Sequence, residues 1–142
     1  MARQWYDFHQ VLAGASARRV EMHQVLIAED EAFTAMALVE ALEGRGHSVK
    51  DAPNGAAAIA VLESFEACVI VTDLMMPKVD GAELIRHVRA KSGPTIPIIL
   101  ITGVPESKLP EDLNYDAYLG KPIDHEALAR LIETLAAGCV HE

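Results

Sequence analysis

Several residue classes that characterise large groups of proteins are scarce in this chain of 142 residues. The 12 Lys and Arg side chains are outnumbered by 21 Asp and Glu side chains, and the resulting formal net charge of −9 argues against general nucleic-acid binding. No apolar run approaches the ~20 residues that cross a bilayer, and the N-terminus lacks the apolar core of a secretory signal. These absences predict a cytoplasmic protein without membrane insertion.

Cysteine and histidine are too few or too scattered to suggest a zinc-binding or disulfide-rich fold. Cys68 falls inside an apolar run and Cys139 lies near the C-terminus, so we expect no disulfide and a reducing, intracellular compartment. None of the six histidines stands three or four residues from another, so no zinc site is predicted. Hydrophobic residues make up 51% of the chain, enough for the core of a single domain.

The part of the chain from residue 23 onward alternates short apolar runs with amphipathic segments. The runs predict strands and the amphipathic segments predict helices, which together indicate an α/β fold with a parallel sheet covered on both faces. The predicted strands cover residues 23–28, 48–52, 68–72, 96–102 and 117–119, and the predicted helices cover 32–43, 56–64, 82–91 and 124–137. Between residues 104 and 115 two prolines leave room for one or two distorted helical turns, and we expect the segment 103–116 to be mobile.

The two ends of the chain are predicted to lie outside the domain, which covers residues 23–137, with a tail at 138–142. In the extension of residues 1–22, the spacing of Trp5, Phe8 and Leu12 permits a short amphipathic helix that docks on a partner or on the domain itself. The alternatives are a loosely ordered tail, or a segment that is not translated, since Met22 directly precedes the first strand.

Polar side chains of matching chemistry stand at the ends of four of the five predicted strands. Glu29 and Asp30 end the first strand, Asp73 the third, Thr102 the fourth and Lys121 the fifth. Because all strands of a parallel sheet end at one edge, these groups should converge. Three close carboxylates repel one another unless a hard cation such as Mg²⁺ binds between them. A carboxylate beside Mg²⁺ and a lysine is also a workable nucleophile towards a phosphoryl group.

The motifs around these residues resemble the receiver domain of two-component response regulators. The motifs are Ile-Ala-Glu29-Asp30-Glu31, Val-Thr-Asp73-Leu-Met-Met-Pro77, Asp80-Gly81, Ile-Leu-Ile-Thr102-Gly103 and Tyr118-Leu-Gly-Lys121-Pro122, in receiver-like order and spacing from about His23 to Ala137. The resemblance implies a flavodoxin-like, doubly wound, five-stranded parallel sheet of order 2-1-3-4-5, with a fourth helix that is short, irregular or missing.

The resemblance also implies a phosphorylation and metal site. Asp73 corresponds to the phosphoacceptor and Asp30 to a direct ligand of Mg²⁺ or Mn²⁺. Glu29 takes the place of the neighbouring acid, and the backbone carbonyl of Met75 would complete the metal site.

Three further residues match the parts of the family that respond to phosphorylation. Lys121 would pair with the phosphoryl group, and its bond to Pro122 is cis in the family. Thr102 would turn its hydroxyl towards a phosphoryl oxygen, after which Tyr118 would move inward as the second half of a switch.

Each residue has a plainer interpretation when it is taken alone. Asp73 could cap a turn before Pro77, and Asp30 could cap the first helix. Thr102 could be an ordinary strand residue, Tyr118 a static aromatic, and Lys121 a solvated surface charge.

The sequence departs from the family pattern in three places. Glu29 stands where Asp is more usual, and Gly103 follows Thr102 where a small residue, often Ala, is usual. The segment between Thr102 and Lys121 is shorter than usual and carries two prolines. Because this segment normally forms part of the activated dimer face, dimerisation through it is in doubt.

The expected function is a stand-alone receiver that accepts a phosphoryl group on Asp73 from a histidine kinase or phosphotransfer protein and signals by protein–protein contact. It would turn over no external substrate. The alternatives are a phosphate shuttle or sink, and a receiver-fold module that binds without phosphorylation. An aspartyl-phosphate phosphohydrolase of the haloacid dehalogenase type is disfavoured, since Met75 stands where that family needs a second Asp.

Overall fold

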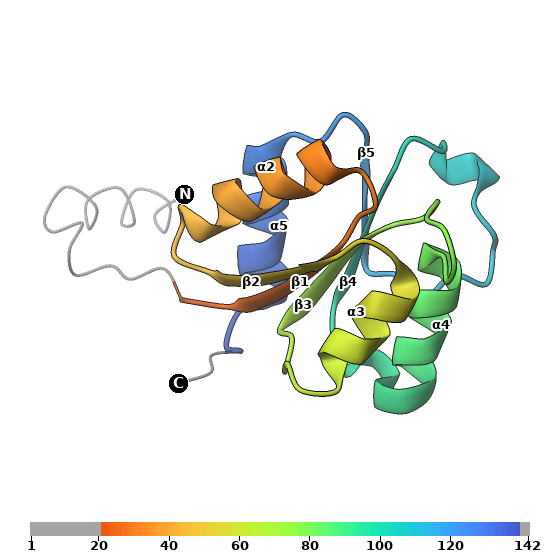
Figure 1. The fold of residues 1–142 in the computed structure, drawn as a ribbon, viewed down its shortest axis with the longest axis horizontal. Coiled ribbons are helices and arrows are strands. Elements are labelled where there is room, and N and C mark those ends of the chain that lie inside the picture. Colours follow the sequence, from red (N-terminus) through yellow and green to blue (C-terminus); the bar gives the residue numbers. More distant parts are fainter. Residues whose placement is uncertain (1–20, 140–142) are drawn as a thin grey trace, which may run out of the picture.

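The computed structural model describes residues 21–139 of the chain. Its five strands form one parallel sheet in the order β2-β1-β3-β4-β5, which confirms the predicted topology (Figure 1). The strands are β1 (Gln24–Ala28), β2 (Ser48–Ala52), β3 (Val69–Asp73), β4 (Ile98–Thr102) and β5 (Ala117–Gly120). The helices are α2 (Ala32–Glu43), α3 (Gly55–Leu62), α4 (Gly81–Ser92) and α5 (His125–Leu135), with short 3₁₀ helices η2 (Gly93–Thr95) and η3 (Glu106–Lys108).

The residue types of the strands explain their places in the sheet. Every residue of β3 and β4 is buried, and both strands are rich in Val and Ile, as expected for central strands covered on both faces. The edge strands β2 and β5 are largely exposed or half-buried, and β2 contains Lys50 and Asp51. Charged residues on an edge strand disfavour pairing with another chain.

Two hydrophobic cores lie on opposite faces of the sheet because successive strand residues point to opposite sides (Figure 1). Helices α3 and α4 cover one face, where Leu26 and Ile70 meet Leu84. Helices α2 and α5 cover the other face, where Val25 and Ile27 meet residues such as Leu38, Leu128 and Ile132. This arrangement leaves the carboxyl edge of the sheet open between the loops.

The segment after β4 is the least regular part of the fold, as the sequence predicts. Its helical content is limited to η3, so the prediction of a short or irregular fourth helix is confirmed. Leu109 and Leu113 bury their side chains, and Arg89 of α4 donates to the Asn114 carbonyl at 2.9 Å and to Asp116 Oδ2 at 2.7 Å. These contacts fix the end of the segment; the predicted mobility of residues 103–116 stays a prediction.

The expectation of no disulfide is wrong. Cys68 and Cys139 are joined by a disulfide across a sequence separation of 71 residues, with their Cα atoms 5.7 Å apart. Cys68 directly precedes β3, and α5 brings the chain back from the carboxyl edge of the sheet to the amino edge, where Cys139 lies. The prediction of a reducing compartment rested on unpaired cysteines, so the cysteines no longer support it.

The proposed N-terminal helix around Trp5, Phe8 and Leu12 lies outside the described residues. Within residues 21–139, no helix combines the length and apolar character needed to cross a membrane.

Two buried histidines stack beside the start of β1. The rings of His23 and His47 lie 5.3 Å apart at an angle of 17°, and the His23 backbone N–H donates to His47 Nδ1 at 3.1 Å. Nδ1 of His47 must therefore be unprotonated. Burial makes the largest contribution to lowering the pKa of His47, and the charges of His23 and Arg45 lower it further. Glu133, whose Oε2 lies 3.6 Å from His47 Nε2, opposes this shift.

We expect the protein to lose stability below the ordinary His pKa of 6.5. The unfolded chain takes up a proton on His47 at that pH, but the folded chain does so only at lower pH, so the free energy of unfolding falls as the pH drops. His47→Asn keeps an acceptor for the His23 N–H without titrating. Urea unfolding between pH 7 and pH 5 should show a shallower pH dependence for this variant, and equal slopes would contradict the assignment.

Candidate functional site

Charged side chains from three strands meet at the carboxyl edge of the sheet. Glu29 follows β1, Asp73 ends β3 and Lys121 follows β5. The Lys121 ammonium lies 2.8 Å from Glu29 Oε1 and 2.9 Å from Asp73 Oδ2. The predicted convergence of these residues is confirmed, and the solvated-lysine alternative does not hold, because Lys121 bridges two buried carboxylates.

The two oxygens of Asp73 have different partners. Oδ1 accepts from the backbone N–H of Leu74 at 2.6 Å and of Met75 at 3.4 Å, whereas Oδ2 accepts from Lys121 at 2.9 Å. The side chain is nearly buried, with 6% of the residue exposed. The backbone thus orients the carboxylate and leaves Oδ2 on the side of the ammonium.

Glu29 is the most buried acid of the site, at 2% exposure. Its Oε2 accepts from the Glu31 N–H at 3.0 Å. Burial, together with the charge of Asp73, raises the pKa of Glu29, although Lys121 and the Glu31 N–H oppose the shift. Burial alone would lower the pKa of Lys121, but its contacts with Asp73 and Glu29 outweigh burial and raise that pKa, so the lysine stays charged.

Asp30 does not cap the first helix. The N-cap of α2 is Glu31, whose side chain accepts from the Thr34 N–H at 3.1 Å. Asp30 is exposed, and one of its carboxylate oxygens lies with oxygens of Glu29 and Asp73 in a group whose members are all within 4.8 Å of one another.

This group suits a hard divalent cation. Three carboxylates and one ammonium carry a formal charge of −2, and Glu29 Oε1 is buried with no hydrogen bond beyond its ion pair with Lys121 among the described residues. Carboxylate oxygens are the ligands that Mg²⁺ takes in proteins, usually with retained water. Glu29, Asp30 and Asp73 are therefore able to hold such an ion.

The loop after β3 is shaped by glycines whose role the sequence did not reveal. Gly81, the first residue of α4, donates its N–H to the Leu74 carbonyl at 2.9 Å, and a Cβ there would overlap the Asp73 carbonyl oxygen. Gly55 approaches the Val79 backbone in the same way. Met75, whose carbonyl is the predicted metal ligand, lies in this loop with 66% of the residue exposed.

The predicted switch residues share a contact with the loop after β4. Thr102 is buried, its Oγ1 accepts from the Val104 N–H at 3.1 Å, and its carbonyl accepts from the Lys121 N–H at 2.9 Å. Tyr118 is half-buried and donates its hydroxyl to the Val104 carbonyl at 2.6 Å. The backbone of Val104 thus connects the two residues. The Lys121–Pro122 peptide bond is cis, as the resemblance implied.

Comparison with known proteins identifies the family. The family model of the response regulator receiver domain matches residues 25–133. This chain belongs to that family. A receiver domain takes part in two-component signalling, and that is the general role of this chain.

Two curated relatives from Brucella abortus differ in how much of them this receiver domain covers. The sensor kinase CckA is 34% identical over an alignment of 116 residues, and the match covers 78% of this chain but 12% of CckA. The response regulator receiver protein CpdR is 34% identical over an alignment of 120 residues, and the match covers 80% of this chain and 97% of CpdR. The match to CckA is therefore a match to one segment of a much longer protein.

Solved structures share the fold. The receiver domain of a Francisella response regulator is 27% identical, with a TM-score of 0.72 over 80% of this chain and 96% of that one. The receiver domain of a Pseudomonas aeruginosa sensor histidine kinase, described with magnesium coordinated in its active-site cleft, is 23% identical, with a TM-score of 0.73 over 82% of this chain and 99% of that one.

Gly81→Ala should disturb the receiver site through its backbone. The added Cβ meets the Asp73 carbonyl, so we expect the free energy of unfolding in urea to fall by about 1–3 kcal/mol. Gly103→Ala is the matched control: its Cβ would meet nothing within 4 Å, and we expect a change within about 0.5 kcal/mol. Equal stability of the two variants would contradict the close approach at Gly81.

Mg²⁺ should stabilise the fold through the acidic cluster. At a concentration one hundred times the dissociation constant, a ligand specific for the folded state adds about 2.7 kcal/mol to the free energy of unfolding. Asp30→Asn should remove most of this gain in a thermal-unfolding titration. Asp112→Asn, which alters an exposed pair with Arg86, should keep it. The same Mg²⁺ effect in both variants would place the cation elsewhere.

Proposed function

We propose that this receiver domain accepts a phosphoryl group on Asp73 and signals in that form by protein–protein contact. The observation that carries the proposal is the Lys121 ammonium held between Asp73 Oδ2 and Glu29, with Asp30 beside them. An oriented carboxylate next to a fixed positive charge is what an attack on phosphorus requires.

In the transfer step, Asp73 Oδ2 forms a bond to phosphorus while the bond from phosphorus to the donor's imidazole nitrogen breaks. The imidazole leaves with the electron pair of that bond. Lys121 pairs with an oxygen of the transferred group as its contact with Oδ2 is given up. Glu29, Asp30, Asp73 and the Met75 carbonyl would hold a divalent cation, which would neutralise charge on the phosphoryl oxygens.

The response is proposed to pass through Thr102 and Tyr118. The Thr102 hydroxyl turns to a phosphoryl oxygen and gives up its bond from the Val104 N–H. The Val104 carbonyl also accepts from Tyr118, so a shift of this loop changes the position of both residues.

The proposed partners are a sensor histidine kinase or a histidine phosphotransfer protein as donor, and a downstream protein as target. Support comes from CckA, named as a sensor kinase, and from CpdR, named as a receiver protein and covered almost entirely. We propose that the chain acts as a stand-alone receiver in the cytoplasm. Its only chemistry would be its own phosphorylation and dephosphorylation.

Two other functions compete with this proposal. A phosphate shuttle or sink would accept the phosphoryl group and pass it on or lose it without contacting a target. A phosphorylation-independent binding module would not accept it at all. Met75, which stands where a dehalogenase-type phosphohydrolase needs a second Asp, speaks against turnover of an external phosphate ester.

Incubation with acetyl phosphate and Mg²⁺ should add a single phosphoryl group, detected as a mass increase of the intact chain. Asp73→Asn should abolish the adduct, because the nucleophilic carboxylate is gone, and Asp112→Asn should leave it unchanged. Beryllofluoride with Mg²⁺ should shift the NMR signals of Thr102 and Tyr118. Absence of an adduct with both reagents in the wild type would leave only the phosphorylation-independent module.

A further inference from the structure

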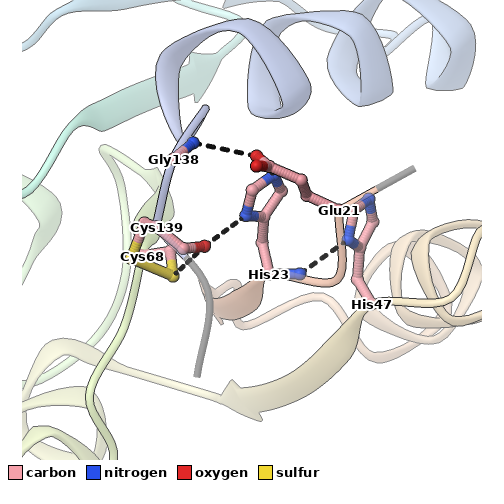
Figure 2. The surroundings of a disulfide bond; sticks show 6 residues. All are labelled: Glu21, His23, His47, Cys68, Gly138 and Cys139. Carbon is pink, nitrogen blue, oxygen red and sulfur yellow. Dashed lines mark hydrogen bonds and ion pairs between the residues drawn. A yellow bond between two sulfur atoms is a disulfide. The ribbon is translucent and has the colours of Figure 1, made fainter. Parts of the chain in front are cut away.

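The Cys68–Cys139 disulfide lies at the amino edge of the sheet, opposite the acidic site. Cys68 precedes β3, and Cys139 is the fourth residue after the end of α5. Figure 2 shows that this bond fastens the chain beyond α5 to the strands, next to Glu21 and His23 at the start of β1. The phosphoacceptor chemistry at the other edge makes no use of it.

Polar contacts hold the same turn in place. Gly138, at φ +89°, donates its N–H to Glu21 Oε1 at 2.8 Å, and Cys139 donates its N–H to the Ala136 carbonyl at 2.9 Å. The Cys139 carbonyl lies 2.7 Å from His23 Nδ1, which must carry the proton because a carbonyl oxygen only accepts (Figure 2). The turn is thus docked on β1 by hydrogen bonds and on β3 by a covalent bond.

The surroundings also suit the reduced state. Cys68 Sγ lies 3.1 Å from the Cys139 carbonyl oxygen, so a Cys68 thiol has an acceptor within reach. That oxygen has two lone pairs, and the His23 ring uses one of them. Reduction therefore leaves the buried sulfur with a partner, and the sheet need not rearrange between the two states.

The two cysteines of the pair differ in exposure. Cys68 is 2% exposed, whereas Cys139 is partly exposed and lines a pocket of about 430 Å³ between α3 and α4. The pocket walls are largely apolar and include Leu62, Phe65 and Val88. Access decides which sulfur is attacked in thiol–disulfide exchange, and here it favours Cys139.

We propose that Cys68 and Cys139 form a reversible thiol–disulfide site that latches the turn after α5 to the amino edge of the sheet. A dithiol reductant attacks Cys139 Sγ through one thiolate, and the Cys68 sulfur leaves with the bonding electrons and takes up a proton. The second thiol of the reductant then displaces Cys139 as a thiol. Overall, one disulfide and one dithiol become two cysteine thiols and the disulfide of the reductant. The inference is independent of the proposed phosphorylation.

The redox part of the proposal is tested on the full chain in buffers of defined ratios of reduced to oxidised dithiothreitol. After acid quenching and alkylation, mass spectrometry should show one transition between a monomer without free thiols and a monomer with two. Free thiols at every ratio, or only mixed or intermolecular disulfides, would overturn the proposal.

The latch is tested by hydrogen exchange on the same samples. Reduction should speed the exchange of the Gly138 and Cys139 amides at least about tenfold, because only non-covalent contacts then hold the turn. The Cys68 amide, bonded to the Gln24 carbonyl inside the sheet, should stay protected on that time scale. In the Cys139→Ser variant these amides should exchange as fast as in the reduced wild type, and added reductant should not change their rates. Identical exchange in the oxidised and reduced wild type would refute the latch.

Discussion

The ion pairs of Lys121 with Glu29 and Asp73 are the contact on which the carboxyl edge of this fold depends. Both carboxylates are nearly fully buried, and a buried carboxylate without a partner is strongly destabilising. The lysine extends from the end of β5 across β4 to Asp73 on β3, and on to Glu29 after β1, so the pairing requires all these strands to end at the same level. The parallel register of the strands therefore positions these charged side chains as well as the residues of the core. The same contact makes one oxygen of Asp73 face a fixed positive charge.

Helix α5 connects the two edges of the sheet at which this chain carries chemistry. It begins at the Asp124 cap, three residues after Lys121, and ends four residues before Cys139. Its apolar face packs on β1, β3 and β4 through residues such as Leu128 and Ile132, which keeps it rigid between the two sites. Lys121 of the proposed phosphorylation site and Cys139 of the proposed thiol–disulfide site thus lie near opposite ends of one helix, although the two proposals rest on separate contacts.

The segment after β4 is the least regular part of this receiver domain. The segment contains only the single turn of η3, and it is fixed near its end by the contacts of Arg89 with Asn114 and Asp116. Its start carries Val104, whose backbone bonds to both Thr102 and Tyr118. A protein that binds this surface would meet loop backbone and exposed polar side chains instead of a regular helix.

Local sequence determined the strands, the sheet class and which polar residues stand at the carboxyl ends of the strands, since short Val- and Ile-rich runs form buried strands. It also determined local features, such as the Asp124 cap of α5 and the absence of a regular helix after β4, where two prolines interrupt the chain. Tertiary structure alone decided which groups touch. It placed Asp30 beside Glu29 and Asp73 in the acidic cluster, brought Gly81 against the Asp73 backbone, and joined Cys68 to Cys139. The physical reason is distance along the chain. A cap or a turn depends on residues within four positions, whereas the disulfide joins residues 71 positions apart, which meet only because α5 runs back against the direction of the strands.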